Sequence, residues 1–495
     1  MPLVPIKLPP GIYRNGTEYQ SQGRWYDANL VRWFEGTLRP MGGWRKWSNN
    51  QVSGVPRGMY AWRDNSSNVW LAVGSASKLY VYQGDGDYAD ITPTSFSAGR
   101  TDATGSIGYG NGDYGEQAYG VARIPSSNSG VLPATTWSMD NWGQYLVACS
   151  DYDGKLYEWQ LDFATPTDAA AITNAPTSCK GLVVSEERFL FALGADGDPR
   201  KVAWSDQEDN TTWTAAANNQ AGDFILSTPG SIICGRRVRG GLLILTDVDA
   251  HLAQYQGPPY VYGFEKVGTG CGAVGVLSIA AADTFAVWMG SSGFWLYDGY
   301  VKPLSSDVSD YVFRNMNRGQ ISKVNAVHNS KFAEIVWFYP SSESNEIDSY
   351  VVWNYRENHW TIGTLGRTVG TGQGVFTSPL MCSSDGYVYE HEAGWNYDGS
   401  TPYAESGPYQ IGVGDNLLVA DQLIPDDLTL GDVTATFKTR LYPTATETTH
   451  GPYSLANPTS VRLQGRQVKV RVNGNNNTDW RVGIMRFNAK QGGKR

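Results

Sequence analysis

Apolar and polar residues alternate in short runs along most of this chain. Seven segments share one layout: a β-branched or aromatic run, a turn rich in Gly, Asp or Ser, and a second run that often reads Leu-Tyr or Val-Tyr. They begin at Val69, Tyr145, Phe189, Leu242, Phe285, Glu334 and Leu380, with start-to-start spacings of 76, 44, 53, 43, 49 and 46 residues. Propeller blades repeat at roughly 40–50 residues. The pattern therefore predicts an all-β chain with a β-propeller-like body of six or seven blades.

Turn residues separate the two runs of these segments. Asp and Gly recur at 85–87, 151–154, 196–198 and 385–386. Gly supplies a positive φ and Asp hydrogen-bonds within its own turn, so we expect hairpin turns. Calcium sites need six or more converging oxygens, which dispersed turns do not supply. No window of twelve or more residues has a convincing helical period, and the best candidate helix, 272–285, is short.

Spacing and composition divide the chain into three predicted parts. Residues 1–50 are expected to form an extended N-terminal arm with short strands that packs on the body. Residues 51–400 form the propeller-like body, with a Gly-rich insertion at 96–134 that accounts for the 76-residue gap. Apolar and basic residues alternate in VRLQGRQVKVRV, which favours a β-sandwich-like module over 401–495. We expect the insertion to face a channel or a partner.

The net charge of −9 conceals an uneven distribution. Residues 1–50 carry seven Lys/Arg and three Asp/Glu, and residues 461–495 carry nine and one, which leaves −21 for residues 51–460. An acidic body argues against a nucleic-acid clamp. The basic ends suit contact with phosphate or, more simply, with the acidic face of a neighbouring subunit.

The sequence offers little catalytic chemistry. The pattern GxGxxG occurs at Gly110-Gly112-Gly115 and at Gly270-Gly272-Gly275, but neither has the strand and long helix that dinucleotide binding requires. The five histidines and five cysteines have no metal-ligand spacing, and the cysteines are expected to be reduced and mostly buried. The chain has neither a signal-peptide pattern nor a run of 18 apolar residues. We therefore expect no membrane insertion.

Several long segments resemble one known family. They are LLILTDVDAHLAQYQGPPYVYGFEKVGTGCGAVG (242–275), VWMGSSGFWLYDGYVKPLSSDVSDYVF (287–313), SYVVWNYRENHWTIG (349–363), the opening GIYRNGTEYQSQGRWYDANLVRW and the closing MRFNAKQGGKR. These segments are similar to tailed-bacteriophage tail nozzle, tail tubular and packaged-DNA stabilisation proteins, which are podophage-like virion components. The resemblance spans residues 11–495.

The resemblance implies a structural role and no enzymatic one. Proteins of this family form a homohexameric ring that continues the DNA channel and retains packaged double-stranded DNA. They contact the head-to-tail adaptor and the tail fibre or spike proteins. The implied location is the virion tail, after synthesis in the host bacterial cytoplasm. No catalytic, cofactor-binding or metal-binding residue is implied.

The basic ends supply the candidate subunit contacts. These candidates are Arg24, Arg32, Arg39, Arg462, Arg466, Lys469, Arg471, Arg481 and Arg486. Deleting 461–495 is expected to abolish assembly and leave the body folded. Two alternatives stay open: a propeller-type glycan-binding or glycan-cleaving protein with a carboxylate pair in its mouth, and a non-viral protein-interaction scaffold.

Overall fold

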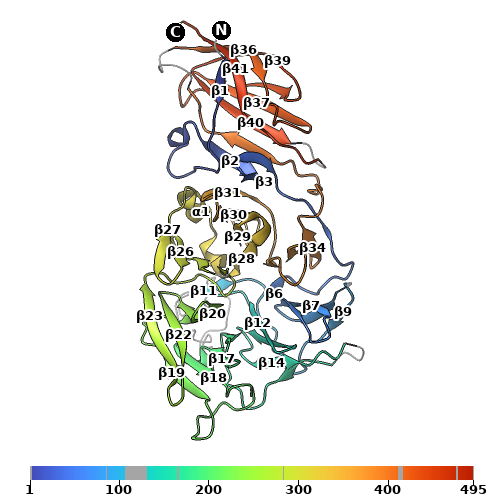
Figure 1. Cartoon of the computed structure of the whole chain (residues 1–495), viewed down its shortest axis with the longest axis vertical. Coiled ribbons are helices and arrows are strands. Elements are labelled where there is room, and N and C mark those ends of the chain that lie inside the picture. The colour runs from blue at the N-terminus through green and yellow to red at the C-terminus, as the bar shows by residue number, and fades with distance from the viewer. Residues whose placement is uncertain are drawn as a thin grey trace, which may run out of the picture.

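Seven four-stranded antiparallel sheets form a ring in the lower part of the computed structural model (Figure 1). The structure describes residues 3–84, 86–105, 131–163, 167–282, 284–410, 416–474 and 478–493. The inner strands of successive sheets touch all the way round, and the inner strand of the seventh meets that of the first. A closed ring of four-stranded sheets is a β-propeller, so the predicted fold is confirmed and the blade count is seven.

Each of the seven repeated segments forms the second and third strands of one blade. The strands, from the inner to the outer, are β6 Pro56–Arg63, β7 Val69–Ser75, β8 Leu79–Gln83 and β9 Tyr88–Asp90; β12 Trp137–Trp142, β13 Tyr145–Ser150, β14 Leu156–Trp159 and β15 Ala170–Ala171; β16 Gly181–Val184, β17 Leu190–Leu193, β18 Lys201–Trp204 and β19 Gly222–Ile225; β20 Ile232–Val238, β21 Gly241–Thr246, β22 Asp249–Gly257 and β23 Val261–Thr269; β24 Ile279–Ala281, β25 Ala286–Met289, β26 Phe294–Tyr297 and β27 Val301–Leu304; β28 Asn325–Asn329, β29 Glu334–Tyr339, β30 Ser349–Asn354 and β31 His359–Thr364; and β32 Val369–Thr371, β33 Leu380–Cys382, β34 Val388–His391 and β5 Trp44–Lys46.

The seventh blade takes its outer strand from the N-terminal region. Strand β5 pairs antiparallel with β34, so that Trp44 lies opposite His391. The Trp44 ring stacks on the His391 ring at 5.5 Å, and the Arg367 guanidinium lies 4.8 Å from the Trp44 ring centroid. The ring of blades is therefore closed by joining segments more than 300 residues apart, which removes a sheet edge.

Both ends of the chain build a β-sandwich above the propeller (Figure 1). One sheet has the order β1-β41-β36-β39 and the other β2-β35-β40-β37-β38. Their strands are β1 Leu3–Ile6, β2 Trp25–Asn29, β35 Tyr403–Ser406, β36 Leu418–Ile424, β37 Val433–Arg440, β38 Thr448–Ser454, β39 Thr459–Gly465, β40 Gln467–Gly474 and β41 Met485–Gln491. Residues 1–50 therefore contribute strands to both the sandwich and blade seven. A hairpin of β3 Val31–Phe34 and β4 Thr37–Pro40 links the two.

The sandwich and the propeller share one hydrophobic core. Phe294, Trp337 and Trp360 from blades five and six belong to the same buried cluster as Trp33 of the hairpin and Phe437 of the sandwich. The backbone N–H of Ile12 donates to the carbonyl of Trp360 at 2.7 Å across this junction. Continuous apolar packing across the junction makes a stiff joint, because protein interiors are close-packed and resist deformation.

The sequence also led to two local expectations, a possible helix at 272–285 and an insertion at 96–134. The described residues of this first range, 272–282 and 284–285, form no helix: Gly272 and Gly275 lie in a loop between β23 and β24, where a side chain on either would strike backbone carbonyls. The described α-helix is α1, Ser309–Arg314, and short 3-10 turns lie at Glu18–Ser21, Ala195–Gly197, Arg318–Lys323 and Ser330–Phe332. Gly110-Gly112-Gly115 and most of the 96–134 insertion lie outside the described residues; its ends form β10 Thr104–Gly105 and β11 Val131–Leu132.

Candidate interaction groove

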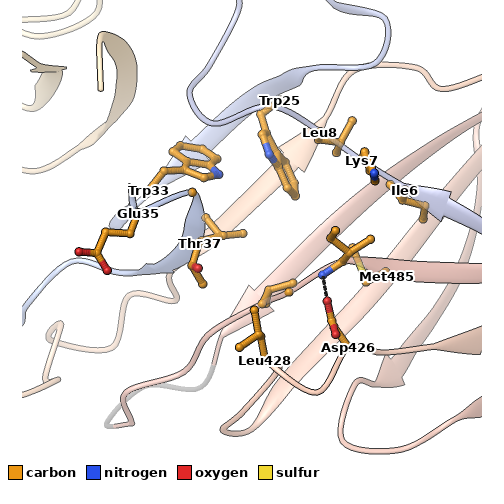
Figure 2. Close-up of a pocket in the computed structure, with 15 residues that line it drawn as sticks. Ile6, Lys7, Leu8, Trp25, Trp33, Glu35, Thr37, Asp426, Leu428 and Met485 are labelled. Atoms are coloured by element: carbon orange, nitrogen blue, oxygen red, sulfur yellow. Dashed lines mark hydrogen bonds between the residues drawn. The ribbon is translucent and has the colours of Figure 1, made fainter. Parts of the chain in front are cut away.

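A groove of about 340 Å³ opens where the sandwich meets the β3–β4 hairpin (Figure 2). Its walls come from the end of β1, from β2, from the hairpin and from two loops of the sandwich. The lining residues are Ile6, Lys7, Leu8, Trp25, Trp33, Glu35, Gly36, Thr37, Leu38, Asp426, Leu428, Val482, Gly483, Ile484 and Met485.

The groove has a buried aromatic side and an exposed aliphatic rim. Trp25 and Trp33 are buried, with ring centroids 5.8 Å apart. On the rim, Leu428 is 60% exposed and Ile484 is 38% exposed. The Asp426 carboxylate accepts a hydrogen bond from the backbone N–H of Ile484 at 2.9 Å, which fixes the two rim loops against each other (Figure 2). A preformed apolar groove with an exposed rim is typical of a protein-binding surface.

A buried ion cluster holds the hairpin that forms one wall. The Arg32 guanidinium donates to Glu334 at 3.1 and 2.9 Å and to Glu392 at 2.9 and 2.5 Å, and it lies 3.7 Å from the Phe332 ring centroid. Burial raises the pKa of Glu334 to about 7 against the opposing charge of Arg32. Burial acts in the same direction on Glu392, but Arg32 outweighs it and holds the pKa of that carboxyl below its usual range. The cluster fastens β3 to blades six and seven.

Two of the nine candidate contact residues are buried and do not lie at the surface. Arg32 and Lys469 are buried in ion pairs within the chain, Lys469 with Glu18 and Glu447. Buried charges are paired because unpaired ones are costly to desolvate, so these two side chains serve this chain's own fold. Four others are partly buried, namely Arg24, Arg39, Arg466 and Arg471, and three are exposed, namely Arg462, Arg481 and Arg486. Arg481 lies 3.6 Å from Asp479.

The rim residues were not among the candidates because a charge pattern does not reveal them. The segment PDDLTLGD places Leu428 and Leu430 in an acidic turn, where apolar side chains cannot reach a core readily. Leu430 is indeed 46% exposed. At the other end of β37, Leu441 and Tyr442 are 49% and 56% exposed in a second turn. The sequence feature that could have identified these exposed residues is the presence of apolar side chains within turn sequences.

Polar contacts cross the propeller near its axis at both ends. Arg237 of blade four reaches Asp140 of blade two at 2.8 Å. At the other end Arg57 of blade one binds Glu346 of blade six at 2.9 and 2.5 Å. Beside it, Lys323 binds Asp102 at 2.5 Å, which ties the start of the insertion to the linker before blade six.

The described residues hold no group of three or more His, Cys, Asp or Glu side chains that could bind a metal ion. All five cysteines are buried and unpaired, as expected, and burial raises the thiol pKa of Cys234 to about 11 and that of Cys179 to about 12. Buried protonated thiols are poor nucleophiles. Within the described parts of the chain, no helix is both long and apolar enough to cross a membrane.

Comparisons with known proteins bear on the fold alone. No family model matches the chain, and no curated protein sequence matches it. Virginiamycin B lyase from Staphylococcus aureus aligns over 70% of this chain and 97% of its own, with a TM-score of 0.43 and 6% identity. The Dos1 propeller aligns over 70% and 95%, with a TM-score of 0.37 and 11% identity. BamB from Moraxella catarrhalis aligns over 69% and 96%, with a TM-score of 0.32 and 11% identity.

Similarity at this level carries no argument about activity. The fold assignment rests on the chain's own sheets, since seven blades close into a ring and the two chain ends pair in one sandwich. The chain is a seven-bladed β-propeller with a β-sandwich fused to it.

Proposed function

We propose that this chain is a structural subunit of a larger protein assembly, in which the propeller is a rigid body and the sandwich is the joint to other subunits. The core shared by the two units carries this proposal, because it transmits force without a hinge. The general part of this proposal is a propeller-type interaction scaffold. Such a role requires no catalytic group, so it does not depend on the reactivity of the buried thiols or ion pairs.

The sandwich has the features of a self-associating module. It carries two groups of exposed apolar side chains: Leu428 and Ile484 on the rim of the groove, and Leu441 and Tyr442 in a turn. They lie at opposite ends of the eight-residue strand β37, which spans about 26 Å at 3.3 Å per residue. A contact between two different surfaces of the same chain generates a ring when the rotation closes. We propose that the turn of one copy enters the groove of the next.

The finer proposal is a ring subunit of a bacteriophage tail. Its support is the resemblance of the long segments between residues 11 and 495 to nozzle and tail tubular proteins. The proposed partners are the head-to-tail adaptor, tail fibre or spike proteins, and passing double-stranded DNA. Because polar contacts cross the propeller axis near both faces, the proposed DNA channel lies between copies and not through a propeller.

The first experiment is native mass spectrometry and electron microscopy of the purified chain. We expect rings for the wild type and monomers for Leu428→Asp with Ile484→Asp. The control is Tyr300→Asp, at a more exposed apolar site on the propeller, which should still form rings. A monomeric wild-type chain at all concentrations, or rings in the double variant, contradicts the proposed interface.

A second experiment separates the virion from other assemblies. Quantitative mass spectrometry of purified virus particles should find this chain at about half the copy number of the portal protein, as a six-fold ring under a twelve-fold portal requires. Absence from particles, with rings present in solution, favours the non-viral scaffold.

A further inference from the structure

A second cavity, of about 380 Å³, opens between blades three and four on the face of the propeller where Arg237 meets Asp140. Its main lining residues are Ser185, Glu187, Arg237, Gly241, Tyr255 and Tyr262. They come from the turn after β16, the β20–β21 turn and the β22–β23 hairpin. The assembly role proposed above uses none of these residues.

On the acidic side of this cavity, a buried tyrosine hydroxyl fixes the position of the Glu187 carboxylate. The hydroxyl of Tyr262 contacts Ser185 Oγ at 2.9 Å and donates to the Glu187 carboxylate at 2.9 Å. Tyr262 is only 6% exposed and packs among the rings of Phe189, Phe191 and Trp204. A carboxylate fixed by a buried hydroxyl loses little conformational entropy when a ligand binds to it, and such preorganisation raises affinity.

The basic side is fixed in the same manner. Arg237 Nη2 donates to Asp140 at 2.8 Å, and the other carboxylate oxygen of Asp140 accepts from the backbone N–H of Val184 at 3.0 Å. Asp140 is buried, whereas the Arg237 side chain stays 45% exposed. The anchored guanidinium therefore presents its remaining N–H groups beside the cavity.

A glycine in the cavity wall lets strand β21 lie close against β22. Gly241 has φ 153°, and a Cβ at this position would collide with the carbonyl oxygen of Ala253. No other residue fits there without moving β22. The start of β21 thus contributes bare backbone to the cavity wall, at a position that only glycine fills without strain.

We propose that this cavity binds an uncharged carbohydrate, one or two sugar units in size. A sugar presents hydroxyl groups that donate and accept, and the wall offers a fixed acceptor in Glu187, a donor in Arg237 and the half-buried ring of Tyr255. Opposite charges on one wall disfavour a ligand with a large net charge of either sign. The inference goes beyond the structural role and does not depend on it.

The test uses the full chain on an array of uncharged, acidic and amino glycans, followed by calorimetry with the best uncharged binder. Glu187→Gln removes the anionic acceptor and keeps the shape, so we expect at least a tenfold loss of affinity. Arg237→Lys, which keeps the charge and loses the fork of donors, should also weaken binding. Unchanged thermal unfolding separates a lost contact from a lost fold.

Glu158→Gln is the matched control, because Glu158 lines a different polar cavity of about 430 Å³, and it should bind as the wild type does. The monomeric Leu428→Asp, Ile484→Asp variant should also bind normally, which keeps this proposal distinct from the assembly proposal. The proposal is overturned if no uncharged glycan binds, if only acidic or amino glycans bind, or if binding is unchanged in both Glu187→Gln and Arg237→Lys.

Discussion

Replacing Arg32 with methionine tests the junction of the propeller and the sandwich. The guanidinium makes four hydrogen bonds to Glu334 and Glu392, and all three side chains are almost fully buried. Methionine fills much of the same volume and leaves two buried carboxylates without their cation. Breaking a buried pair in this way costs about 3–5 kcal/mol. We expect the variant to lose about this much stability at pH 7.

The assay is urea unfolding followed by tryptophan fluorescence, with Arg24→Met as the control. Arg24 pairs with Asp307 at 2.8 Å, but both side chains are over a third exposed, and a surface pair contributes only about 0–1 kcal/mol. The midpoint should fall clearly for Arg32→Met and hardly for Arg24→Met. Equal midpoints for the two variants would refute the argument that the Arg32 cluster fastens the hairpin.

The pH dependence of the Arg32→Met variant provides an independent check. Burial already raises the pKa of Glu334 to about 7 with Arg32 present. Without the arginine, Glu392 loses the interaction that holds its pKa down. A folded-state pKa above the unfolded value gives stability that is present at low pH and lost as pH rises through the folded pKa. The defect of the variant should therefore be largest above pH 7 and smaller near pH 5. A defect that does not change with pH contradicts this account.

Three further predictions concern the blades. Burial raises the pKa of Asp151 to about 6, so Asp151→Asn should stabilise the fold by up to about 3 kcal/mol at pH 8 and not at pH 4, as pH-dependent thermal unfolding will measure. Gly74→Ala should lower the unfolding midpoint, because its Cβ would lie 2.5 Å from the Trp137 ring. The control is Gly105→Ala at an exposed position, where a Cβ would lie within 4 Å of no atom in the part of the chain that the structure describes. Trp44→Ala should open the closure of blade seven and speed limited proteolysis near residue 45, because Trp44 packs on His391 and Arg367; unchanged cleavage would contradict this.

Deleting 461–495 is a poor test of assembly, although the positive charge of this segment suggested it. That segment contains β40 and β41, and β41 pairs with β1 while β40 pairs with β35. Its loss would strip strands from both sheets and expose the core shared with the propeller. Point variants on the groove rim therefore test assembly more cleanly.

The alternation of apolar residues and the turn chemistry determined the seven hairpins. Each hairpin is made of residues close in sequence, and its first strand buries residues such as Val147 and Ile244 against a neighbouring blade. The pattern was therefore sufficient to predict the fold class. Local sequence was less informative for 272–285, where small apolar residues fit a loop or a helix equally well.

Long-range pairing decided what the sequence alone left open. Strand β5 closes blade seven with a partner more than 300 residues away, and β1 and β2 join strands from the other end of the chain. Likewise, Arg32 and Lys469 look like surface charges in the sequence, yet they are buried because Glu334, Glu392, Glu18 and Glu447 come to meet them. Hairpins depend on local alternation and turns, whereas ring closure, burial of charges and both cavities depend on which distant segments the folded chain brings together.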